Sequence, residues 1–194
     1  MLAAAQASLQ AGAFDAGLGL LATAETTELD AFQHARVELL RGQVAFASGL
    51  FSDAPPLLLT AARLLEPVDM ELARDTYLNA WSAAILVSFR FGEEGTLTEI
   101  CSAVRALPPP LGAPRPVDLV LDGLALLFTD GHAAAAATFK RAAKVLTSLT
   151  VDDLLGWGWT AATVAFGNWD LASLHAITVR HVQLQPGQRT IRRQ

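Results

Sequence analysis

Apolar residues recur along this chain at the three- and four-residue spacing of amphipathic helices. Glycine, proline or aspartate separates one such segment from the next. The segment that ends at Ser48, for example, carries Phe32, Val37, Leu40 and Val44 at helical spacing. The pattern predicts helices without strands. The expected helices lie at about 1–11, 14–26, 30–48, 53–66, 70–89, 93–107, 117–129, 132–147, 151–166 and 170–184.

Several of these helices begin at residues that commonly cap a helix N-terminus. Asp69 is expected to cap the helix at 70–89, and Thr150 the one at 151–166. Ser52 or Asp53 is expected to cap the helix that follows residue 53. This assignment leaves Pro55 and Pro56 in the first turn, where a missing N–H group costs little because it has no intrahelical acceptor.

Small and large residues alternate in a fixed order between residues 42 and 67. The order is small, small, aromatic, small, large, small and then proline, given by Gly42, Gly49, Phe51, Ala54, Leu58, Ala61 and Pro67. Two antiparallel helices approach closely only where small side chains lie between their backbones. The pattern resembles the consensus of tetratricopeptide (TPR) repeats, which are antiparallel helical hairpins.

The same order occurs five times, with varying fidelity. The aromatic position falls at residues 14, 51, 91, 132 and 169, which are 37, 40, 41 and 37 residues apart. This spacing is longer than the roughly 34 residues of a strict TPR. The third copy is degenerate, because Ser82, Phe89, Phe91, Glu94, Thr98 and Cys101 occupy its six positions. We therefore expect an all-α protein, a TPR-like right-handed α-solenoid of about five antiparallel hairpins.

A proline-rich stretch divides this array. Residues 108–116 contain five prolines and are expected to form a stiff, non-helical linker. Hairpins one to three are then expected at 1–107, hairpins four and five at 117–185, and a polar, basic tail at 186–194.

Five strings of the sequence carry a resemblance to a known family. They span residues 10–16, 36–49, 53–67, 73–80 and 118–127, the last directly after the linker. They resemble the TPR-like middle region of the large ATP-binding regulators of the LuxR family, the MalT-like transcriptional activators. The resemblance implies a P-loop ATPase before the repeats and a DNA-binding helix-turn-helix domain after them, in a bacterial protein.

Neither of those two flanking parts is found in the sequence. The P-loop motif G-x-x-x-x-G-K-[ST] does not occur, and Lys140 and Lys144 follow no glycine-rich loop. No basic helix-turn-helix pattern follows Leu184. We therefore expect this chain alone to bind neither ATP nor promoter DNA. It is interpreted as a fragment of a larger regulator or as a stand-alone relative.

Composition favours a cytoplasmic protein without direct nucleic-acid binding. The net charge is −5, whereas a nucleic-acid binder needs a basic face. Cys101 is the only cysteine, which excludes an internal disulfide. The longest uncharged runs, 76–89 and 154–169, fall short of the ~20 residues that span a bilayer, so no membrane contact is expected.

The sequence offers little for catalysis or metal binding. Its four histidines are His34, His132, His175 and His181, and the last two lie six residues apart, on different sides of one helix. The acidic pairs 93–94 and 152–153 fall at expected helix N-termini, where carboxylates are favoured by the helix dipole. We expect no enzyme, no catalytic residue, no cofactor and no metal.

The first helix of each TPR hairpin lines the inner surface of the array, and this register predicts a groove for a protein segment or a small-molecule effector. Packing against neighbouring helices remains the alternative role for each of its residues. Trp157 and Trp159 point to different sides of one helix, so one of them is expected to face the groove. The predicted groove residues are Arg36, Gln43, Phe46, Asn79, Leu86, Leu124, Leu127 and Trp157.

The helix expected at 170–184 is apolar on nearly all sides, although a terminal repeat needs a polar outer face. We therefore expect self-association at this end, as a homodimer, through Leu171, Leu174, Ile177 and Val182. The alternative is that a ligand or the tail residues cover this helix. These patterns predict a sensor or protein-interaction segment of a LuxR-type ATP-binding regulator, which relays effector or partner binding to domains outside this chain. The alternative is a stand-alone TPR-like adaptor with no regulatory domains.

Overall fold

The prediction of an all-α protein is confirmed for the residues that the structure describes. A computed structural model describes residues 1–92, 94–146, 157–158, 160–162, 164–165 and 171–184. Within these ranges the regular structure is helical and contains no strand. The chain divides into two compact units, Met1–Leu107 and Pro108–Gln194. We describe each unit by itself.

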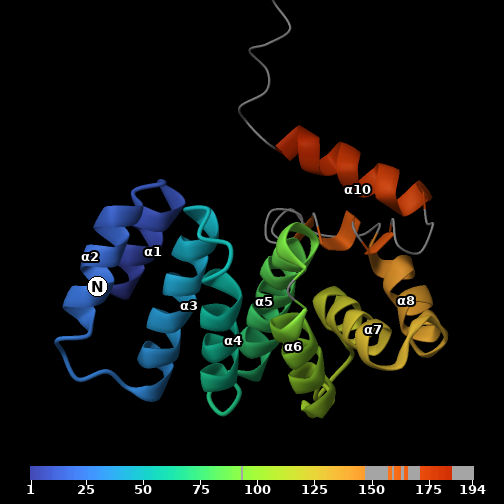
Figure 1. Ribbon diagram of the computed structural model, residues 1–194, viewed down its shortest axis with the longest axis horizontal. Coiled ribbons are helices and arrows are strands. Elements are labelled where there is room, and N and C mark those ends of the chain that lie inside the picture. Colours follow the sequence, from blue (N-terminus) through green and yellow to red (C-terminus); the bar gives the residue numbers. More distant parts are fainter. Residues whose placement is uncertain (93, 147–156, 159, 163, 166–170, 185–194) are drawn as a thin grey trace, which may run out of the picture. The chain divides into compact units, whose positions relative to one another are not determined.

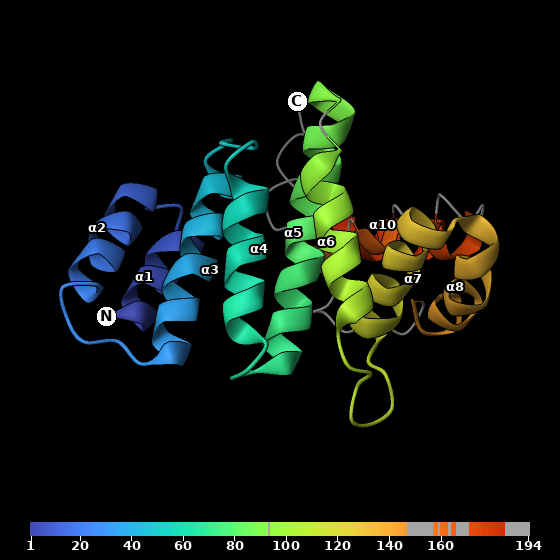
Figure 2. The ribbon, with the colours of Figure 1, turned by 60° about the horizontal axis from the view of Figure 1, so that its bottom comes forward.

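The first unit is a row of helices in which each helix packs against the next one in the chain (Figures 1 and 2). The helices are α1 (Leu2–Gln10), α2 (Phe14–Ala24), α3 (Ala31–Ala47), α4 (Ala54–Leu65), α5 (Met70–Phe91) and α6 (Gly95–Ala106). Helix α3 also contacts α1, and α6 also contacts α4, so the packing extends beyond single hairpins.

The caps that the sequence predicts for α4 and α5 have different outcomes. Asp69 accepts a hydrogen bond from the Leu72 N–H at 2.9 Å, which confirms its predicted capping role. Asp53 occupies the N-cap position of α4, but its side chain accepts no cap hydrogen bond. The prediction of a side-chain cap there is wrong, because N-cap side chains bond the second or third N–H of a helix and Pro55 and Pro56 have none.

Two helices of the first unit, α3 and α5, end close to a glycine with a positive φ angle. Gly49 follows α3 with a φ of 80°, and Gly92 follows α5 with a φ of 72°. Glycine adopts these angles without the steric cost that a Cβ imposes. Helix α5 continues to Phe91, two residues beyond the expected end at Phe89, because Gly92 is the first residue suited to end it.

Two hairpins, one in each unit, pack a glycine of the first helix against a large residue of the second. A Cβ on Gly42 of α3 would lie 2.7 Å from the Leu58 side chain of α4. A Cβ on Gly123 of α7 (Pro116–Asp130) would lie 2.6 Å from the ring of Phe139, in α8 (His132–Leu146). Both pairs occupy the first small and the large position of the repeat pattern. These glycines therefore set how closely the two helices approach.

The third hairpin, α5–α6, departs from this arrangement. Glu94 and Thr98, at the positions of Ala54 and Leu58, are exposed to solvent. Cys101, at the position of Ala61, is buried. The long α5 contributes the bulky Trp81 to this core. The degenerate sequence of the third copy thus corresponds to a differently packed hairpin.

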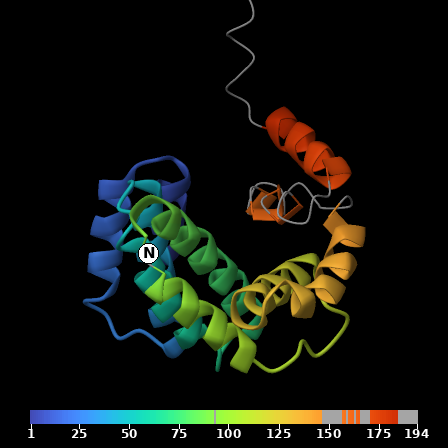
Figure 3. The same cartoon turned by 45° about the vertical axis from the view of Figure 1, so that its right-hand side comes forward.

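The second unit contains α7, α8 and α10 (Leu171–Leu184) among its described helices. Helix α8 contacts both α7 and α10 (Figures 1 and 3). Helix α7 begins at Pro116, one residue inside the expected linker, because the missing N–H of proline has no acceptor in a first turn. Its start is fixed by Asp118, which accepts hydrogen bonds from the Arg115 main chain and guanidinium.

Several expectations for this unit lie outside the described residues. They are the Thr150 cap, the acidic pair at 152–153, Trp159, the last repeat positions at 167 and 169, and the tail at 186–194. Glu93, in the first unit, is outside them as well.

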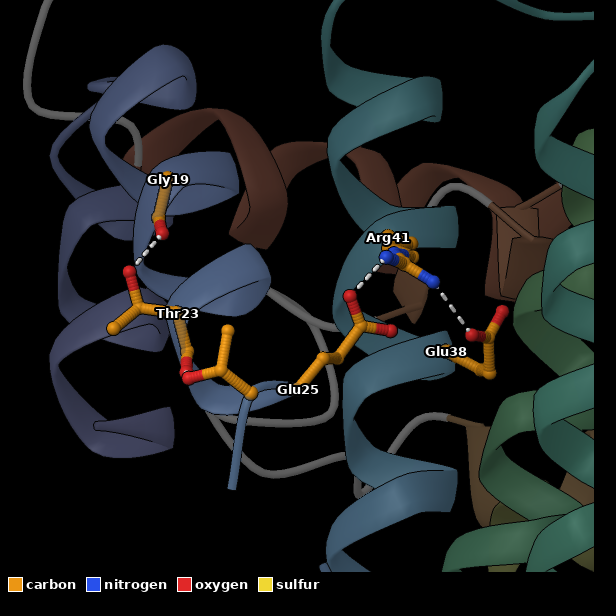
Figure 4. A network of polar contacts seen from close by, with 6 residues as sticks. Gly19, Thr23, Glu25, Glu38 and Arg41 are labelled. Carbon is orange, nitrogen blue, oxygen red and sulfur yellow. Dashed lines mark hydrogen bonds and ion pairs between the residues drawn. The ribbon is translucent and has the colours of Figure 1, made fainter. Parts of the chain in front are cut away.

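Ion pairs also link helices of the first unit. Arg41 of α3 binds Glu25, directly after α2, and Glu38, one turn earlier on α3 (Figure 4). Arg63 of α4 binds Glu99 of α6 at 2.9 Å. These pairs are partly or largely solvated, so each contributes on the order of 1 kcal/mol or less.

Candidate functional site

The predicted groove residue with the most distinctive surroundings is Arg36, near the start of α3. Its guanidinium lies 6.0 Å from the centre of the Phe32 ring. One terminal NH2 group donates to Gln6 of α1 at 3.4 Å, which is long for a hydrogen bond. Its Nε is buried and has no hydrogen-bond partner within the described structure. A buried donor without a partner costs about 1–3 kcal/mol.

The other predicted groove residues of the first unit border solvent. Gln43 and Phe46 of α3, and Asn79 and Leu86 of α5, are all half-buried. Arg36 and Gln43 are seven residues apart on α3, and so are Asn79 and Leu86 on α5. Seven residues make about two helical turns, so each pair lies on one face of its helix. These two helix faces are the part of the predicted groove that the first unit contains.

The remaining predicted groove residues belong to the second unit. Leu124 and Trp157 are buried, and Leu127 is half-buried. Burial leaves little surface of Leu124 or Trp157 for a ligand, and it matches the alternative that they pack against neighbouring helices. The two units thus each contain a share of the eight residues, five in the first and three in the second.

Helix α10 carries the residues expected to mediate self-association. Ile177 is buried and Leu174 half-buried, whereas Val182 is 54% exposed. The side chain of Leu171 lies outside the described part of the chain. Self-association through α10 stays a prediction, and Val182 is the position that tests it with least damage to the core.

A buried polar contact that the sequence did not reveal joins α4 to α5. The hydroxyl of Tyr77, whose side chain is fully buried, donates to the Glu66 carboxylate just after α4. Burial and this carboxylate raise the pKa of Tyr77 above its ordinary value, in that order of size. The residues are eleven apart and on different helices, so only the tertiary structure brings them together.

Cys101 is inert in its surroundings. Burial raises the pKa of its thiol to about 12, and an interaction with the Trp81 indole N–H opposes the shift to a smaller extent. Because the thiolate is the nucleophilic form, this environment suppresses reactivity near neutral pH. Cys101 therefore serves as a small packing residue.

The described residues contain no group of three or more His, Cys, Asp or Glu side chains placed to hold a metal ion. His34, His132 and His175 are exposed and far from one another in the sequence. Nor does any helix in the described ranges have the length and apolar composition required to cross a membrane.

The sequence analysis did not identify a second group of side chains, which surrounds Arg90. The guanidinium of Arg90, at the end of α5, lies 6.0 Å from the ring centre of Phe51 and 5.9 Å from that of Phe91. Phe51 packs edge-on against the predicted groove residue Phe46, with ring centres 5.9 Å apart. The signal in the sequence is the string Phe89-Arg90-Phe91, which places two aromatic residues and a cation together at the end of a helix.

Comparisons with known proteins identify no relative of this chain: no family model, no curated protein and no solved structure matches it. Its function is therefore proposed from its sequence and its structure.

Proposed function

We propose that this chain is a non-enzymatic, TPR-like interaction module. In this proposal its helices form a right-handed α-solenoid of about five hairpins. The packing of Gly42 on Leu58 and of Gly123 on Phe139 supports it, because both pairs join the same two positions of the repeat pattern. Exposure of Glu94 and Thr98 in the third hairpin marks where the repeat is irregular.

We further propose that the module is the sensor segment of a LuxR-type ATP-binding transcriptional regulator in the bacterial cytoplasm. Binding of a protein or small-molecule effector at the faces of α3 and α5 would favour one arrangement of successive hairpins. Such a shift requires that the effector bind one arrangement more tightly than another. Dimerisation through α10 belongs to the same proposal, and ATP and DNA contacts are assigned to domains outside this chain.

The observation that carries a binding role is the buried Nε of Arg36. An arginine retained for stability alone is expected to have its donors paired, as Arg41 does with Glu25 and Glu38. Arg36 instead keeps one donor without an acceptor, beside a long contact to Gln6. A carbonyl or carboxylate oxygen of a bound effector that reached Nε would remove that cost.

This role predicts opposite effects for two arginines of the same helix. Arg36→Met removes the unpartnered donor and keeps most of the side-chain volume, so we expect the free energy of unfolding to stay constant or rise by up to ~2 kcal/mol. Arg41→Met, the control, removes two ion pairs and should lower it by about 0.5–1 kcal/mol. Urea unfolding at pH 7.5 measures both. A loss of more than about 1 kcal/mol in Arg36→Met would mean that Arg36 stabilises the fold and is not kept for a ligand.

A further inference from the structure

The surface around Arg90 combines exposed aromatic rings with one cation. We define the aromatic–arginine cluster as Phe46, Phe51, Arg90 and Phe91. It joins the end of α3, the turn before α4 and the end of α5, at the opposite end of α3 from Arg36. Phe91 is 54% exposed and Arg90 is exposed, while Phe46 and Phe51 are half-buried. Leu50, next to Phe51, is also 54% exposed.

The position of the cluster explains its exposure. Helix α5 has 22 residues, whereas α4 and α6 have 12 each. The end of the α5–α6 hairpin extends past α4 (Figure 2). The exposed side chains of Phe89 and Phe91 lie in this last turn of α5. Exposed apolar side chains that gather at one place mark interaction surfaces more often than single exposed ones do.

Arg90 differs from Arg63, an exposed cation of α4, in its partners. Arg63 is paired with Glu99, but within the described residues no carboxylate forms an ion pair with Arg90. The helix dipole favours a cation in the last turn of α5, which accounts for a basic residue there. The dipole does not account for the position of the guanidinium beside two aromatic rings, those of Phe51 and Phe91. Stacking on rings leaves the N–H groups at the edge of a guanidinium able to bind a planar carboxylate.

These observations also limit the charge of the partner. The unit around Arg90 is acidic, since residues 1–107 hold 13 acidic and 6 basic side chains. A strongly acidic partner would be repelled by this unit at a distance. A partner segment with a single carboxylate and apolar neighbours is complementary to Arg90 and the aromatic rings of Phe51 and Phe91. Arginine and aromatic residues are also the types that dominate binding energy at protein interfaces.

We propose that the aromatic–arginine cluster docks an apolar segment of a partner protein that carries one carboxylate. The carboxylate binds the guanidinium of Arg90, and the apolar side chains next to it pack on Phe91 and Leu50. This site is separate from the Arg36 face, so either can be present without the other.

The test uses the full chain and a fluorescein-labelled, amidated peptide, Gly-Ser-Leu-Phe-Glu-Leu-Leu-Ser, in a fluorescence-polarisation titration. We expect saturable binding that weakens about tenfold in Arg90→Gln and in Phe91→Ala. Replacing the Glu of the peptide by Gln should weaken binding about tenfold as well, and replacing its Leu and Phe by Ser should abolish it. A peptide with four additional Glu residues should bind more weakly at low salt.

Two control variants separate this site from general effects. Arg141→Gln removes the same charge from an exposed position of α8, and Phe89→Ala removes an 80% exposed ring from the same turn of α5. Phe89 lies about 200° around the helix from Phe91, and Arg141 belongs to the other unit. Both controls should therefore bind the peptide like the unmodified chain. Unchanged binding in Arg90→Gln overturns the proposal. A second result would also overturn it: the peptide does not bind, and light scattering shows a dimer that Arg90→Gln converts to a monomer. In that case the cluster binds a second copy of this chain.

Discussion

Replacing Gly42 by alanine is expected to lower the free energy of unfolding by about 1–3 kcal/mol, even though alanine is the better helix former by ~1 kcal/mol. The new Cβ would lie 2.7 Å from both Cγ and Cδ2 of Leu58 and 3.1 Å from its main-chain nitrogen. Carbon atoms in contact prefer about 3.5–4.0 Å, so α3 and α4 must move apart or Leu58 must leave its position. Gly123→Ala should have the same effect through the Phe139 ring.

Gly19→Ala in α2 is the matched control, because a Cβ there meets no atom within 4 Å. It should raise the free energy of unfolding by about 0.5–1 kcal/mol through helix propensity alone. Urea unfolding of the three variants measures these values. If Gly42→Ala is as stable as Gly19→Ala, the close approach of α3 and α4 is wrong, and with it the repeat register.

Stability is expected to fall steeply above pH 9. Burial raises the pKa of Cys101 from 9.0 to about 12, so the unfolded chain releases this proton at a lower pH than the folded chain does. The stabilisation is therefore complete below pH 9 and is lost as the pH rises toward about 12. One pH unit corresponds to about 1.4 kcal/mol, which gives a loss of up to ~4 kcal/mol from this group. Tyr77, whose pKa is also raised, adds a second loss that begins above pH 10.

These two contributions can be measured separately because the chain has one cysteine and one tyrosine. Urea unfolding of the unmodified chain, Cys101→Ala and Tyr77→Phe is compared between pH 7.5 and 11. Alanine occupies the position of Cys101 in other copies of the repeat, as Ala24, Ala61 and Ala142, so it should be accepted there. The loss between pH 9 and 10 should disappear in Cys101→Ala and persist in Tyr77→Phe. An identical profile in all three proteins would contradict the burial of both groups.

The helices could be predicted from the sequence because their boundaries depend on local chemistry. Asp69 accepts from an N–H three residues away, and Gly92 ends α5 through its own backbone angle. The absence of a side-chain cap at Asp53 also has a local cause, because Pro55 and Pro56, which have no N–H group to donate, are visible in the sequence. The expected end of α5 at Phe89 falls two residues short, because the last buried residue, Val87, precedes the end of the helix at Phe91.

The surroundings of the candidate sites could not be predicted in the same way. The repeat register predicts Arg36 as a groove residue of α3, but its contact with Gln6 joins residues 30 apart in the sequence. The contact between Arg90 and Phe51 depends on how far α5 extends past α4, a distance that no local pattern encodes. Leu124 shares its spacing with half-buried residues and is nevertheless buried, because burial depends on the neighbouring helices.

The central claim, that this chain is the sensor segment of a LuxR-type ATP-binding regulator, is tested most directly by sequencing the genomic reading frame that encodes it. The proposal predicts a G-x-x-x-x-G-K-[ST] motif upstream of the segment and a helix-turn-helix pattern downstream of it, in one continuous frame. A frame that encodes neither would contradict the claim and leave the stand-alone TPR-like adaptor as the function to test.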